Sequence, residues 1–96
     1  MPIKVRGYLT FREIIGERSI AIAEGETLTI NDLLLRMSED LDQRFRETIY
    51  DPRTKILGEH VAVIVNGRSY HNLPDKLETL LKDGDEVAIF PPMAGG

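Results

Sequence analysis

The sequence predicts a single α+β domain, in which a mixed sheet of about five strands packs on one main helix and an extended, flexible tail follows. Three observations lead to this fold class. Apolar and polar residues alternate near the N-terminus, apolar residues recur at helical spacing in the middle, and strand-like runs separated by turn signals fill the second half. The predicted order is β-β-α-β-β-β, with a body at residues 1–90 and a tail at residues 91–96.

The first two strands are predicted from alternation. Residues 3–11 place Tyr8 on the outward register, and residues 18–23 alternate again after a break at Gly16. An antiparallel hairpin is therefore expected. The inward register of the first strand carries apolar residues around one glycine: Ile3, Val5, Gly7, Leu9 and Phe11.

The main helix is predicted to begin after Thr29, because this hydroxyl is followed three residues later by the carboxylate of Asp32. Phe45 and Ile49 prolong the same period, so the helix either continues or restarts before Pro52. One apolar stripe is expected to face the sheet: Ile30, Leu33, Leu34, Met37 and Leu41.

The β-branched run at residues 61–65 predicts a central strand, after an exposed loop at residues 50–59. Asn66-Gly67 predicts a two-residue turn into a short strand at residues 68–70.

A helical turn at residues 76–81 and a turn at residues 82–85 are predicted before the last strand, residues 86–90. Pro91 and Pro92 end that strand, because neither can donate to a sheet ladder.

Composition excludes several classes of function. A formal net charge of −4 without a basic cluster argues against nucleic acid as a partner. The absence of cysteine excludes disulfides and thiolate chemistry. His60 and His71 lack metal-ligand spacing, and Asp83-Gly84-Asp85 lacks the remaining ligands of a calcium loop, so no metal site is expected. With neither a signal sequence nor a long apolar run, the chain is expected to be soluble and cytoplasmic, with no membrane partner.

The sequence ends in Gly95 and Gly96, which is the feature most informative about function. Two terminal glycines arise by chance in roughly 0.5% of chains. A backbone without side chains can enter a narrow channel and present its carboxylate to the active site of another protein. An adenylating enzyme could activate that carboxylate, because a carboxylate oxygen can attack the α-phosphorus of ATP.

Residues 83–96, which read DGDEVAIFPPMAGG, resemble the C-terminal signature of the MoaD family, the small subunits of molybdopterin synthase. Residues 3–5 and 11–16 resemble the first strand of that family and the turn after it. Residues 38–59 form a longer segment than is usual there.

This resemblance implies a ubiquitin-like β-grasp fold and a role as a sulfur carrier. Gly96 would be adenylated by a MoeB-like enzyme, with ATP used by that enzyme, and then thiocarboxylated with sulfur from a sulfurtransferase or cysteine desulfurase. A MoaE-like large subunit would accept the inserted tail for sulfur transfer to a pterin. The chain would then be a sulfur-donor subunit that binds no cofactor, and not an enzyme on its own. The implied tail contacts are Pro91, Pro92, Met93, Ala94 and Gly95.

Two exposed aromatics are candidate docking residues. Alternation turns Phe90 outward on the strand that leads to the tail, and Tyr8 is outward on the first strand. Arg12 could pair with a partner carboxylate, although a single arginine after a strand is more often a solvated charge.

Two alternatives stay open. A carrier of the same fold could serve tRNA thiolation, cysteine or thiamin synthesis, or could be conjugated to protein lysines. A passive β-grasp interaction module would keep its full function after deletion of Gly96.

Overall fold

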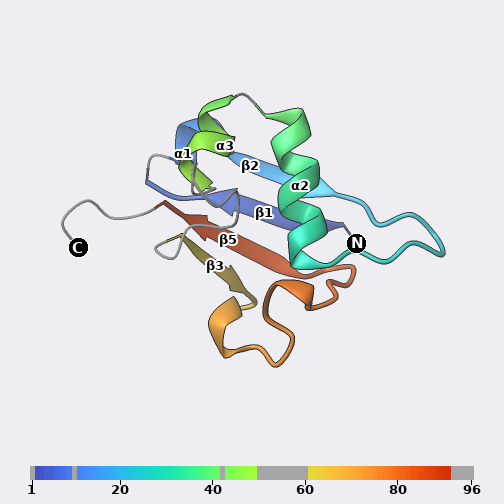
Figure 1. Cartoon of the computed structure of the whole chain (residues 1–96). Helices are drawn as coiled ribbons and strands as arrows, with labels where there is room; N and C mark the ends of the chain where they lie inside the picture. The colour runs from blue at the N-terminus through green and yellow to red at the C-terminus, as the bar shows by residue number, and fades with distance from the viewer. Residues whose placement is uncertain (1, 10, 42, 50–60, 92–96) are drawn as a thin grey trace.

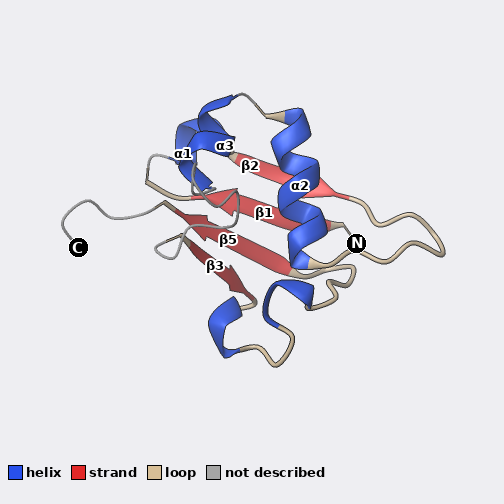
Figure 2. Cartoon of the chain, viewed as in Figure 1, coloured by secondary structure: helices blue, strands red, loops and turns tan. Residues whose placement is uncertain are grey.

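The body of the protein is a mixed sheet with helices packed on one face (Figure 1, Figure 2). The computed structural model describes residues 2–9, 11–41, 43–49 and 61–91. Five strands lie in the order β2-β1-β5-β3-β4. The predicted α+β architecture and strand order along the chain are confirmed. The strands are β1 (Ile3–Gly7), β2 (Glu17–Ile20), β3 (Ala62–Val65), β4 (Arg68–Ser69) and β5 (Glu86–Phe90).

Strand pairing follows from the burial of alternate residues. β1 pairs antiparallel with β2, as predicted, and parallel with β5 in the register Val5↔Val87. Both valines are buried, and a slip of one residue would turn them to the open face of the sheet. β5 occupies the middle of the sheet because it also pairs antiparallel with β3. The prediction that residues 61–65 form a central strand is confirmed, because β3 lies between β5 and β4 and its side chains are alternately buried and half-buried.

Helix α2 (Ile30–Asp40) lies across one face of the sheet (Figure 1). The predicted capping box is present, because Thr29 accepts a bond from the Asp32 amide at 3.0 Å and Asp32 accepts one from the Thr29 amide at 3.1 Å. Four side chains of the predicted stripe are almost fully buried against the sheet, and each contributes about 2 kcal/mol by removing its apolar surface from water. They are Ile30, Leu33, Leu34 and Met37.

Helix α2 is capped at Leu41, and a separate helix, α3 (Gln43–Ile49), follows it. A restart of this kind is one of the two outcomes that the periodicity left open. Phe45 and Ile49 are fully buried. The Phe45 ring contacts that of Phe11, with centroids 5.8 Å apart. Thus α3 extends the core beyond the end of α2.

The first strand ends earlier than its alternation predicts. β1 stops at Gly7, Leu9 adopts a left-handed φ of 56°, and residues Phe11–Ile14 form the short helix α1. Phe11 is buried as predicted, but Leu9 is 53% exposed. The reason is tertiary: turning at Leu9 allows Phe11 to reach the core from a helix. The second strand is likewise shorter than predicted, since it ends at Ile20.

The second half contains tight turns at the predicted places. Asn66 and Gly67 both adopt positive φ and connect β3 to β4. Two 3-10 helices follow, η1 (Tyr70–Asn72) and η2 (Lys76–Glu78). The helical turn predicted at residues 76–81 is shorter than expected, because Leu80 bridges to Thr29 in an extended conformation and Leu81 is buried.

No helix among the described residues has the length and apolar character needed to cross a membrane. The loop predicted at residues 50–59 lies outside the described residues, as does most of the predicted tail, residues 92–96.

Candidate functional site

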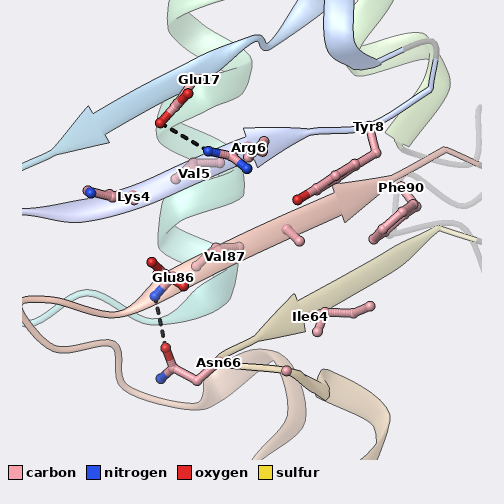
Figure 3. A pocket seen from close by; sticks show the side chains of 12 residues that line it. Lys4, Val5, Arg6, Tyr8, Glu17, Ile64, Asn66, Glu86, Val87 and Phe90 are labelled. Carbon is pink, nitrogen blue, oxygen red and sulfur yellow. Dashed lines mark hydrogen bonds and ion pairs between the residues drawn. The ribbon is translucent and has the colours of Figure 1, made fainter.

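The face of the sheet opposite α2 carries a groove with a volume of about 300 Å³. Figure 3 looks onto this open face, with α2 behind the strands. Alternation brings its side chains together, because the even-numbered residues of β1 and β5 point away from the core. The groove is lined mainly by β1, β5 and β3, with contributions from β2 and the β3–β4 turn: Lys4, Arg6, Tyr8, Glu17, Ile64, Asn66, Glu86, Ala88 and Phe90 among others.

One end of the groove is aromatic. The rings of Tyr8 and Phe90 stack with centroids 4.6 Å apart and planes 9° from parallel (Figure 3). The backbone positions them, because the Tyr8 amide donates to the Ile89 carbonyl at 3.0 Å. Both side chains are half-buried and so present apolar surface at the end of β5, where the chain continues to Pro91. The two aromatics proposed from sequence alone thus form one surface.

Arg6 lies beside this stack and connects it to β2. Its guanidinium is 3.3 Å from the Glu17 carboxylate, and both side chains are more than half exposed. A hydrogen bond to the Tyr8 side chain, and a hydrogen bond and charge attraction to Glu17, raise the pKa of Arg6. Because both side chains are exposed, solvent screens this pair and it adds little to stability.

The opposite end of the groove is polar and held by one side chain. The Asn66 amide nitrogen donates to Asp85 at 3.0 Å, and its amide oxygen accepts from the Glu86 amide at 2.9 Å. Asp85 also accepts from the Lys82 amide at 2.8 Å and is only 8% exposed. These bonds fix the β3–β4 turn against the start of β5.

The other site residues predicted from the sequence either do not line the groove or lie outside the described residues. Arg12 is exposed on α1 and is not among the residues that line the groove. Pro91 is buried against its own chain. Pro92, Met93, Ala94, Gly95 and Gly96 lie outside the described residues.

Sequence reasoning did not single out Lys4, Arg6 or Ile64. Lys4 and Arg6 share the even register of Tyr8, so the same alternation could have placed them beside it. Ile64 belongs to a continuous apolar run, in which the open face cannot be told from the core face by pattern.

Within the described residues, no group of three or more His, Asp or Glu side chains is arranged to hold a metal ion. The groove reaches the Tyr8–Phe90 stack at the end of β5, the strand that continues to Pro91.

Comparison with known proteins identifies the family. Residues 8–96 match the model of the ThiS family. The chain belongs to the ThiS family. It is 38% identical to small archaeal modifier protein 3 of Haloferax volcanii, over 100% of both chains. It is 30% identical to the molybdopterin synthase sulfur carrier subunit of Drosophila melanogaster, over 77% of this chain and 98% of that protein.

The solution structure of small archaeal modifier protein 1 from Methanosarcina acetivorans superimposes with a TM-score of 0.76. Its sequence is 30% identical, and the match covers 98% of this chain and 95% of that one. The ubiquitin-like β-grasp fold implied by the sequence resemblance is thereby confirmed. The chain is a small ubiquitin-like carrier or modifier, which acts with partner proteins and is not an enzyme by itself.

Proposed function

We propose that the chain is a sulfur carrier whose reacting group is the carboxylate of Gly96, and that it serves as the small subunit of a molybdopterin synthase. The observation that carries this proposal is the aromatic stack of Tyr8 and Phe90, a half-buried apolar surface at the end of the strand that leads to the tail. A partner that binds this surface brings its own active site toward the chain end. Membership of a family of carriers supports the same role.

The chemistry needs only the chain end. A carboxylate oxygen of Gly96 attacks the α-phosphorus of ATP on a MoeB-like enzyme, pyrophosphate leaves, and an acyl-adenylate forms. The terminal sulfur of a persulfide on a sulfurtransferase or cysteine desulfurase then displaces AMP and forms an acyl disulfide. A second thiol cleaves the S–S bond, which releases the thiocarboxylate and leaves the two thiols joined as a disulfide. Thiocarboxylate sulfur is a better nucleophile than carboxylate oxygen, which suits its transfer to a pterin held by a MoaE-like subunit.

The docking residues divide into two groups under this proposal. Tyr8 and Phe90 contact the partner directly, with Arg12 as a peripheral charge. Pro91 is buried, so it fixes the direction in which the chain leaves β5. Pro92, Met93, Ala94 and Gly95 enter the partner, where the small side chain of Ala94 and the absence of one at Gly95 suit the narrow end of a channel.

A second candidate function is conjugation to protein lysines. It is favoured by the 38% identity to a protein named as a modifier, over the full length of both chains. The activated Gly96 carboxylate would be the same, but the acceptor would be an amine, and an isopeptide bond would form.

Intact mass spectrometry tests the shared step. After incubation with ATP, a MoeB-like enzyme and a sulfur source, the chain should become about 16 Da heavier as one oxygen is replaced by sulfur. A variant lacking Gly96 and a variant with one residue appended after it are the matched controls and should stay unchanged. An unaltered mass of the wild-type chain would overturn the proposal.

The acceptor is tested with the thiocarboxylated chain. Incubation with a MoaE-like subunit and the pterin precursor should return the chain to its original mass and yield a dithiolene-bearing pterin. Covalent attachment to lysines, without sulfur transfer to the pterin, would instead select the modifier function.

A further inference from the structure

Leu9 combines two features that are unfavourable in the isolated chain. Its backbone is left-handed, with a φ of 56°, and its side chain is 53% exposed. Glycine or asparagine adopts this backbone with less strain, and a polar side chain is easier to solvate. Residues that break local rules in a folded domain are commonly functional.

The other non-glycine residues with positive φ in the described part of the chain differ from Leu9. Asn66 is of a type that tolerates this conformation, and its side chain makes two hydrogen bonds that hold the turn. Lys76 is exposed but polar. Leu9 alone among them presents a large apolar side chain to water.

Leu9 is held in place by its neighbours. The Phe11 amide donates to the Tyr8 carbonyl, and the Arg12 amide donates to the Leu9 carbonyl, both at 3.0 Å. Phe11 is fully buried, which anchors the far side of the turn in the core. Backbone bonds and the buried Phe11 ring thus tie Leu9 to its neighbours, which reduces the ordering that binding would require.

Its position is next to the start of the tail. The Tyr8 amide donates to the Ile89 carbonyl and so joins the end of the β1 segment to β5. Leu9 is the next residue along the chain. This is the end of the sheet at which β5 leads to Pro91 (Figure 1). Any enzyme that takes the tail into its active site must approach this end, where the Tyr8–Phe90 stack also lies.

We propose that Leu9 is a binding anchor that inserts into an apolar pocket of the ATP-dependent activating enzyme, beside the channel for the tail. This proposal rests on the proposed function, and it names a contact that the aromatic stack does not supply. The strain at Leu9 is then explained, because glycine or asparagine would relieve it but would remove the anchor.

The test compares Leu9→Asn with the wild-type chain in two assays. Thermal unfolding should show a Tm about 3 °C higher for the variant, because strain is relieved. ATP–pyrophosphate exchange catalysed by the activating enzyme from the same organism should show a KM for the chain about tenfold higher, with kcat within about twofold of wild type. A higher Tm together with a higher KM distinguishes a binding role from loss of structure.

Matched variants separate the contact from general surface effects. Leu9→Met keeps an apolar side chain on the same strained backbone and should restore the KM to within about threefold of wild type. Leu35→Asn and Leu80→Asn change leucines that are 49% and 57% exposed elsewhere on the surface, and both should leave the KM unchanged.

Each contrary result has a separate meaning. If the wild-type chain is adenylated and Leu9→Asn has the same KM, the Leu9 proposal is wrong while the proposed function stands. If sedimentation shows that Leu9→Asn disrupts a dimer without changing the KM, a second copy covers Leu9 and the proposal is also wrong. If the wild-type chain is not adenylated, both proposals fail.

Discussion

Replacing Gly7 with alanine tests how tightly the end of β1 packs against α1. A β-carbon at this position would overlap the carbonyl oxygen of Phe11 and would lie 2.8 Å from the carbonyl carbon of that residue and 2.9 Å from the β-carbon of Ile15. The nearest atoms belong to the backbone, and Phe11 is fully buried. They cannot move aside without displacing the Phe11 ring from its contact with Phe45.

The size of the effect follows from this geometry. Inserting a methyl group into a packed site costs about 1–3 kcal/mol, and the upper end applies when the obstructing atoms are backbone. We therefore expect Gly7→Ala to lower the free energy of unfolding by about 3 kcal/mol. With an m-value of about 1 kcal/mol/M for a domain of this size, the urea midpoint should fall by about 3 M. Urea unfolding followed by circular dichroism measures this change.

Gly25→Ala provides the matched control. Gly25 has a φ of 80° and no atom within 4 Å of an added β-carbon, so alanine there introduces backbone strain without a clash and should cost about 1 kcal/mol. A Gly7→Ala variant within about 0.5 kcal/mol of wild type would refute the packing argument. So would equal losses for the two variants.

Three further predictions concern the groove and its surroundings. Phe90→Ala should weaken binding to the activating enzyme by about 1–2 kcal/mol, measured by calorimetry, whereas Tyr8→Phe keeps the stacked ring and should bind nearly as well as wild type. Asn66→Ala should lower the free energy of unfolding by about 2–3 kcal/mol, because it removes two hydrogen bonds and strains the positive φ. Asn66→Gly should lower it by less, because glycine loses the same bonds but tolerates this φ. Equal urea midpoints for the two variants would contradict this reasoning. Burial raises the pKa of Tyr70, so the neutral phenol is favoured in the folded state, and stability should fall as the pH rises above about 10. Tyr70→Phe should lose less stability than wild type between about pH 8 and about pH 11 in urea unfolding, and identical losses would rule out a contribution from this side chain.

Much of the candidate site could be predicted from alternation alone. Alternation predicts a strand at residues 86–90 with Phe90 outward, and it places Tyr8 outward on the first strand. In the structure both side chains line the open face of the sheet, although Tyr8 directly follows the end of β1 at Gly7. Their mutual contact could not be predicted, because it depends on the parallel pairing of β1 with β5 across some eighty residues of sequence. The same long-range pairing places β5 in the middle of the sheet, next to the interior strand that the apolar run at residues 61–65 predicts.

Elements with local signals can be predicted from the sequence alone. Helix α2 begins at the predicted cap because Thr29 and Asp32 are three residues apart, and the Asn66-Gly67 turn forms because both residues tolerate positive φ. The end of β1 at Gly7 and the exposure of Leu9 depend instead on tertiary packing. The alternation of residues 3–11 fits a longer strand equally well. The core instead takes Phe11 from a helix, because burying that ring against Phe45 outweighs the strain at Leu9.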